Sequence, residues 1–135
     1  MCNSHNFKFI KQSGLQLFLK REFERKYNKN LNPDECIIDS TNKILYIIEK
    51  KFQQCSGSVD EKIQTGYVKS LMYKKLYPTY TIEYMYVLSD WFAHKKYKLD
   101  LDINTKLGVS HVFGSDPDYK TIILDWISPI VLDDN

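Results

Sequence analysis

The sequence lacks the features that would place it in a membrane or outside the cell. No run of apolar residues is long enough to span a bilayer, and the N-terminal MCNSHNFKF has no apolar stretch of the kind found in signal peptides. Its three cysteines, Cys2, Cys36 and Cys55, are odd in number and show no paired metal-binding spacing. We therefore expect reduced thiols, a cytoplasmic location and no contact with a membrane.

The signatures of several enzyme classes are also missing. There is no glycine-rich phosphate loop, nucleophile elbow or zinc-binding pattern. The histidines His5, His94 and His111 are scattered, with none at metal-ligand spacing from another, which favours structural or solvent-facing roles. No internal repeat or low-complexity linker interrupts the 135 residues, and 43% of them are hydrophobic. These features indicate one globular domain with a sizeable core.

Positive charge is concentrated in the first part of the chain. Residues 1–75 hold 14 Lys or Arg against 8 Asp or Glu, whereas residues 76–135 hold 5 against 9. The basic part fits a polyanionic partner, while the acidic part argues against a protein that coats DNA uniformly.

The hydrophobic patterns predict an α/β fold, with a small mixed β-sheet flanked by helices in the order helix, hairpin, helix, strand, helix, strand. Residues 6–11 fit either a short edge strand or a loose lead-in. Short connections imply that the strand after the second helix runs parallel to the strand before it. The predicted elements are a helix at 14–27, a hairpin around the turn 40–42, a helix from about 59 to 76 with Val59, Ile63, Tyr67 and Leu71 buried, a strand at 79–89, a helix at 97–107, a strand at 109–113 and an extended segment at 119–132.

The sharpest chemical signal lies at the end of the second hairpin strand. Glu49 and Lys51 are two residues apart, so they share a strand face with Leu45 and Ile47. Asp34 opens the preceding strand, so the hairpin brings it towards Glu49. Charged groups at the tip of an apolar strand are unfavourable unless they pair with opposite charges or have a role in binding or catalysis. Two carboxylates and one lysine in this position indicate a Mg²⁺ site with a charged helper group.

These residues resemble the motif of the PD-(D/E)XK nuclease superfamily, with Pro33-Asp34 followed by Glu49-Lys50-Lys51. The wider run IIEKKFQQCSGSVDEKIQ and the later YVLSDWF are similar to a subset of type II restriction endonucleases. The motif follows an apolar strand and precedes a helix that Ser58 and Glu61 would cap, which makes the match more specific. The resemblance implies a single nuclease-like domain over residues 1–135, with a restriction-endonuclease-like core at about 13–113 and a C-terminal strand region at 119–132.

The resemblance also implies roles for residues of the motif. Asp34 and Glu49 would bind Mg²⁺, or Mn²⁺ as a substitute, with the main-chain carbonyl of Lys50 as a further ligand. Lys51 would orient or help to deprotonate the attacking water. The alternative is that Glu49 and Lys51 form a salt bridge at a sheet edge and that Asp34 is an ordinary turn residue.

Two further catalytic residues are implied on helices. Glu22 would match the acidic residue that many members contribute from the first helix, although pairing with Lys26 explains it equally well. Gln64 would match a glutamine that some members place on the helix after the motif. Its usual partner, a tyrosine four residues later, is replaced by Val68, and Tyr67 or Tyr73 are the possible substitutes.

The family core usually has a further strand between the first helix and the Asp34 strand. Residues 28–32 are too few to form this strand, so residues 6–11 would have to supply it out of order.

The sequence therefore predicts a metal-dependent endonuclease that hydrolyses phosphodiester bonds in double-stranded DNA, in the manner of a restriction enzyme. A homodimer is favoured, because one site cuts one strand. The candidates for phosphate contacts are Arg21, Arg25, Lys26, Lys62 and Lys69. Two alternatives stay open: a non-catalytic DNA-binding module or nuclease subunit on the same fold, and an interaction protein that uses the ten tyrosines at a surface.

Overall fold

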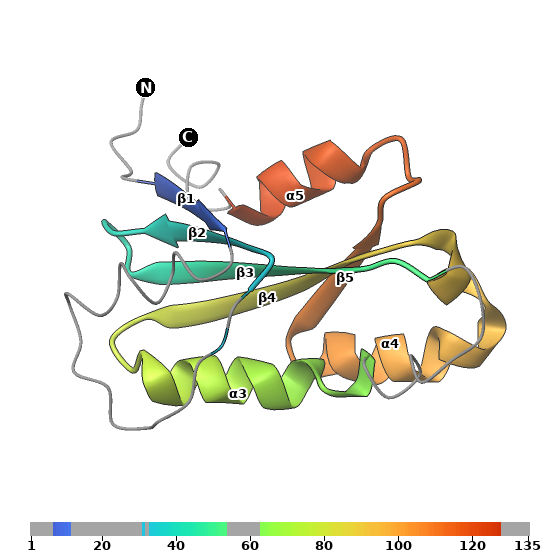
Figure 1. Ribbon diagram of the computed structural model, residues 1–135, viewed down its shortest axis with the longest axis horizontal. Helices are drawn as coiled ribbons and strands as arrows, with labels where there is room; N and C mark the ends of the chain where they lie inside the picture. Colours follow the sequence, from blue (N-terminus) through green and yellow to red (C-terminus); the bar gives the residue numbers. More distant parts are fainter. Residues whose placement is uncertain (1–6, 12–30, 32, 54–62, 128–135) are drawn as a thin grey trace.

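The computed structural model describes residues 7–11, 31, 33–53 and 63–127, and these form a five-stranded mixed sheet with helices on both faces (Figure 1). The predicted α/β fold is confirmed. None of the described helices is long and apolar enough to cross a membrane. The described elements are β1 (Phe7–Lys11), β2 (Glu35–Asp39), β3 (Ile44–Lys51), α3 (Gly66–Leu76), β4 (Thr81–Leu88), the 3-10 turns η1 (Asp90–Ala93) and η2 (Lys95–Tyr97), α4 (Lys98–Lys106), β5 (Val109–Phe113) and α5 (Tyr119–Ile127).

The strands lie in the sheet in chain order, β1-β2-β3-β4-β5. The pairs β1–β2 and β2–β3 are antiparallel, whereas the pairs β3–β4 and β4–β5 are parallel. The predicted hairpin and the predicted parallel strand after the second helix are both confirmed. Residues 7–11 form an edge strand antiparallel to β2, which confirms the edge strand as the right choice of the two predicted for this segment.

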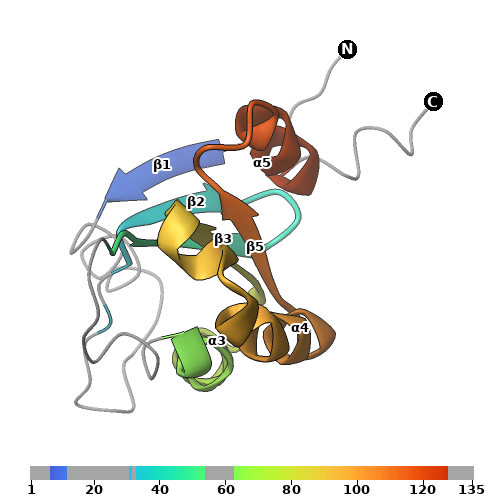
Figure 2. The ribbon, with the colours of Figure 1, turned by 90° about the vertical axis from the view of Figure 1, so that its right-hand side faces the viewer.

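Strand alternation divides the core into two clusters, one on each face of the sheet. Helices α3 and α4 cover one face, and α5 covers the other (Figures 1 and 2). Within β3, Leu45 and Ile47 belong to the first cluster, while Tyr46 and Ile48 belong to the second. Because both faces are covered, the apolar character of both sides of β3 is explained.

The buried face of α3 differs from the predicted one. Ile63 is fully buried, but Leu71 is 42% exposed, and Val59 lies outside the described residues. The helix instead turns Gly66 and Ser70 towards the sheet, followed by Tyr73 and Leu76. The prediction was right for Ile63 and for Tyr67, which packs against the core, and wrong for Leu71, because it followed hydrophobicity alone. Gly66 faces the sheet because the ring of Tyr86 fills the space that a side chain there would need.

The C-terminal segment also differs from the prediction. Residues 119–127, predicted to be extended, form helix α5, and residues 128–132 lie outside the described part of the chain. An apolar run without glycine or proline is compatible with either a buried strand or a helix, and here tertiary packing decides. Helical spacing places four side chains on the second face of the sheet, where the ring of Trp126 meets that of Tyr46 edge-on at 5.2 Å. The four are Tyr119, Ile123, Trp126 and Ile127.

The hairpin turn is held by a buried carboxylate, Asp39, which is only 2% exposed. Its oxygens accept hydrogen bonds from the main-chain N of Thr41 (3.1 Å) and of Asn42 (3.1 Å), and from the Asn42 Nδ2 (2.9 Å). We expect Asp39→Ala to lower the free energy of unfolding by about 2 kcal/mol, because three donors lose a charged acceptor. Urea denaturation measures this loss. Asp39→Asn keeps one acceptor oxygen and should lose less, whereas an unchanged urea midpoint in Asp39→Ala would contradict the assignment.

Candidate active site

Two acidic side chains meet near the end of the hairpin. Glu49 is the sixth residue of β3 and is 7% exposed. The antiparallel register pairs Glu35 with Ile48, so one step further places Asp34 beside Glu49. A carboxylate oxygen of Asp34 accepts a hydrogen bond from the main-chain N of Lys50 at 2.7 Å, and a hydrogen bond joins the Asp34 and Glu49 side chains. The structure therefore brings together the two acids that the sequence singled out.

The environment of Glu49 raises the pKa of its carboxyl above the ordinary value, chiefly because burial disfavours the charged form. Lys69 and Lys51 oppose this effect with their positive charges, while the charge of Asp34 and the hydrogen bond with it act in the same direction as burial. The two lysines thus offset the effect of burial and of Asp34 on the Glu49 pKa only in part. The buried Glu49 carboxylate is therefore stabilised by a further positive charge placed beside it.

Three lysines surround the acids in different ways. Lys51 is half-buried on the face of Glu49, as the sequence predicted. Lys69, also half-buried, reaches the same site from α3. Lys50 points to the opposite face, where its Nζ lies 3.1 Å from the Glu35 Oε2. Alternation along β3 therefore separates one ion pair from the site and leaves two positive charges beside the acids.

Buried tyrosines pack on the same side of the sheet as the acids. Tyr84 of β4 lies 6.3 Å from Tyr73 of α3 and 5.7 Å from Tyr86, measured between ring centroids. The hydroxyl of Tyr86 donates to the Ile63 carbonyl at 3.2 Å, and burial raises its pKa to about 12. Burial first, and then the charge of Glu49, raise the pKa of the Tyr73 and Tyr84 hydroxyls well above the ordinary value. All three tyrosines therefore stay protonated at neutral pH and are hydrogen-bond donors.

Sequence reasoning named Tyr73 only as a possible substitute and missed Tyr84. The signal for Tyr84 was present in the alternation of β4, whose residues 82, 84, 86 and 88 all join the cluster on the Glu49 face. Using that signal required the pairing between β3 and β4, in which Tyr84 lies opposite Ile47 and Tyr86 opposite Glu49.

The remaining predicted residues are divided between described and undescribed segments. Gln64 is exposed, and its Nε2 donates to the Asp100 Oδ1 at 3.3 Å, which directs its side chain towards α4. The predicted site residues outside the described segments are Glu22, Arg21, Arg25, Lys26 and Lys62.

The residues present fit a hard divalent cation such as Mg²⁺. Their donors are carboxylate oxygens, which such ions prefer. The described residues contain no cluster of three or more His, Cys, Asp or Glu side chains placed to hold a metal ion. Within this part of the chain, Asp34 and Glu49 are thus the side-chain donors of the candidate site, and Glu22, the third predicted acid, lies outside it.

A separate cavity of about 1060 Å³ lies on the opposite face of the sheet. Ile48 and Val87 form its wall on the sheet, and Ile123 of α5 lies across from them. Strand β3 itself separates this space from Glu49, because Ile48 and Glu49 point to opposite faces. The cavity is therefore no part of the acidic site.

Comparison with known proteins gives a family match. Residues 3–85 match the family model for the PD-(D/E)XK nuclease superfamily domain, which is more than half of the chain. The matched segment holds Asp34, Glu49 and Lys51 and extends into β4. No curated protein and no solved structure matched the chain.

Proposed function

Because the chain belongs to the PD-(D/E)XK nuclease superfamily, we propose that it is a metal-dependent endonuclease acting on double-stranded DNA. One observation carries the proposal: the superfamily motif lies in the matched segment, and its two acids are in contact beside Lys51. A buried Glu49 paired with Asp34 beside two lysines fits phosphodiester hydrolysis, in which a cation and a negatively charged phosphate must be held together.

Each residue of the site has a separate task in this proposal. Asp34 and Glu49 would hold Mg²⁺ with the main-chain carbonyl of Lys50, and the ion would supply Lewis-acid chemistry that activates a water and neutralises charge on the scissile phosphate. Lys51 orients the attacking water and offsets the charge that develops on the phosphate. Lys69 contacts a phosphate from α3, which positions the substrate without reading its sequence.

We further propose cleavage of the restriction type by a homodimer. Each chain carries one acid pair, and one site cuts one strand, so two copies would be needed to cut both strands of a duplex. The sequence resemblance to type II restriction endonucleases supports this finer proposal.

The decisive experiment is incubation of unmodified plasmid with the purified protein and Mg²⁺ or Mn²⁺, beside Glu49→Ala. We expect discrete fragments that disappear with EDTA and in the variant. Absence of cleavage over several DNAs and both metals would overturn the proposal. In that case, salt-dependent DNA binding would indicate a non-catalytic binding module.

Lys69→Ala should weaken DNA binding at every sequence, since the contact is with phosphate. We expect the slope of log K against log salt to fall by about 1, the value for one lost phosphate contact. Fluorescence anisotropy with a labelled duplex in EDTA measures this without cleavage.

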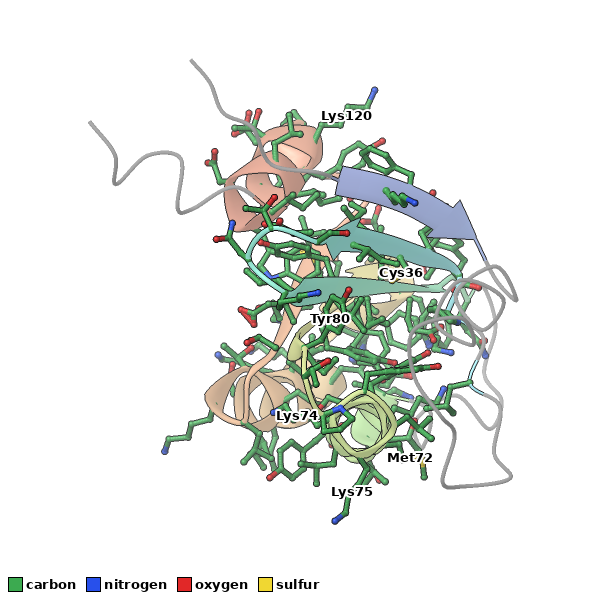
Figure 3. The ribbon with its side chains drawn as sticks, turned by 90° about the vertical axis from the view of Figure 1, so that its left-hand side faces the viewer. Cys36, Met72, Lys74, Lys75, Tyr80 and Lys120 are labelled. Atoms are coloured by element: carbon green, nitrogen blue, oxygen red, sulfur yellow. The ribbon has the colours of Figure 1, made fainter. Side chains whose placement is uncertain are left out.

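The matched control is Lys75→Ala. Lys75 is exposed on the same helix and points away from the sheet (Figure 3). Its removal should leave the slope unchanged. Equal slopes for Lys69→Ala and the wild type would contradict a phosphate contact at Lys69.

A further inference from the structure

The hydroxyl of Tyr84 is a buried donor with no acceptor among the residues that the structure describes. Tyr84 is 1% exposed, and its Oη forms no hydrogen bond with any residue that the structure describes. Buried polar atoms are nearly always paired, because an unpaired one loses its hydrogen bonds to water without replacement. A phenylalanine would fill the same space without this loss. The hydroxyl therefore calls for an explanation other than packing.

Tyr84 and Glu49 lie near each other on the same face of the sheet. Tyr84 lies opposite Ile47 in the parallel pairing of β3 and β4, and Glu49 is the next residue of β3 on the same face. The charges of both Glu49 and Asp34 act on the Tyr84 hydroxyl. The nearby Tyr86 differs, because its hydroxyl already donates to a main-chain carbonyl. The charge of Glu49 acts on both of these β4 hydroxyls, but that of Tyr86 already has an acceptor, whereas that of Tyr84 has none among the described residues.

The ring of Tyr84 is held in place by its neighbours. The rings of Tyr73 and Tyr86 lie within 6.3 Å and 5.7 Å of it, and all three side chains are at most 1% exposed. Close packing of this kind leaves a side chain few alternative rotamers. The hydroxyl is thus fixed before any ligand arrives.

We propose that Tyr84 is a positioning residue whose hydroxyl donates a hydrogen bond to the Glu49 carboxylate and holds it in the orientation that binds a divalent cation. The inference rests on the proposed function and deepens it. In the structure, Asp34 and Glu49 share a hydrogen bond. If both carboxylates held a cation, the Tyr84 hydroxyl would be the donor available to Glu49 in place of that bond. Donors behind a ligating group orient it in this way in many metal sites.

The test compares Tyr84→Phe with wild type in two measurements. Without metal, in EDTA, thermal unfolding should show a variant at least as stable as wild type, since only an unpaired hydroxyl is lost. With Mg²⁺ alone as ligand, isothermal titration calorimetry should show affinity weaker by about tenfold, the loss typical of a missing outer-shell partner. Tyr46→Phe is the matched control, because Tyr46 is a buried strand tyrosine on the opposite face. It should keep the Mg²⁺ affinity of wild type.

The outcomes separate this inference from the proposed function. Weaker Mg²⁺ binding without loss of metal-free stability supports the positioning role, since a purely structural hydroxyl would not combine the two. Unchanged Mg²⁺ affinity in Tyr84→Phe, or a clear loss of stability in EDTA, overturns the inference alone, provided that wild type binds Mg²⁺ and cleaves DNA. A wild type that does neither overturns the proposed function, and the inference falls with it.

Discussion

Glu49→Gln should abolish cleavage while leaving the protein folded. The amide keeps the size of the side chain but removes the negative charge that a divalent cation requires, so we expect a rate lower by on the order of 10³-fold or more. Cleavage of plasmid under single-turnover conditions measures this loss. Circular dichroism checks that the fold is intact. Residual cleavage within a few-fold of wild type would remove Glu49 from the active site.

The same variant should be more stable than wild type when metal is absent, by an amount that depends on pH. Burial and Asp34 raise the Glu49 pKa in the folded protein above its ordinary value of 4.5. Between these two pKa values the folded state binds more protons than the unfolded state, so wild-type stability falls as pH rises through this window. Glutamine has no proton to lose. The advantage of Glu49→Gln should therefore be small below pH 4.5, grow through the window and level off above the raised pKa.

Thermal unfolding in EDTA between pH 4 and pH 8 follows this difference. Glu35→Gln is a suitable control, because Glu35 pairs with Lys50 on the other face of the sheet. It should show no gain. A Glu49→Gln protein less stable than wild type at neutral pH would show that the charge of Glu49 is satisfied within the metal-free fold.

Gly66→Val should be the most destabilising of the substitutions considered for the scaffold. A Cβ on Gly66 would lie 2.7 Å from the Tyr86 Oη and 2.8 Å from its Cε2. Tyr86 is fully buried, so its ring has no free space to move into. We expect the free energy of unfolding to fall by about 3 kcal/mol, as is typical of strong overpacking. Urea denaturation measures the loss.

Two companion variants isolate the cause. Lys75→Val places the same side chain at an exposed position of α3 and should lose only about 0.5 kcal/mol, from lower helix propensity. Tyr86→Phe in the Gly66→Val background removes the nearest atom but keeps the ring, so it should restore part of the loss. Equal effects of valine at positions 66 and 75 would show that the close approach of α3 to β4 does not limit this site.

The parts of the fold that sequence predicted depend on short-range patterns. Alternation in residues 44–51 identified a central strand with Glu49 and Lys51 on one face, and the polar turn at 40–42 located the hairpin. Both features are decided within a few residues of chain. Helix α5 and the buried face of α3 were not predicted correctly, because each depends on the surface against which the helix packs. The ring of Tyr86 on β4 occupies the space that a side chain at position 66 would need, which selects Gly66 for the inner side of α3.

The same distinction applies to the candidate site. Asp34 and Glu49 could be placed together because one hairpin joins them. Lys69 and Tyr84 reach the site through a helix and a parallel strand, and their proximity depends on how these elements stack on β3. Periodicity predicts the face on which a residue lies, but not the residue it meets on the next element.

The function of β3 depends on its register, because successive residues of the strand point to opposite faces of the sheet. Odd-numbered residues from Leu45 to Glu49 face the helix pair and the acid site, while Tyr46 and Ile48 face α5. A shift of the strand by one residue would present Lys50 in place of Glu49 and expose the apolar side chains of each face to the wrong layer. The turn that Asp39 stabilises fixes the register of β3 against β2. A single inserted residue there would therefore disable the chemistry of a site ten positions away without altering any residue in it.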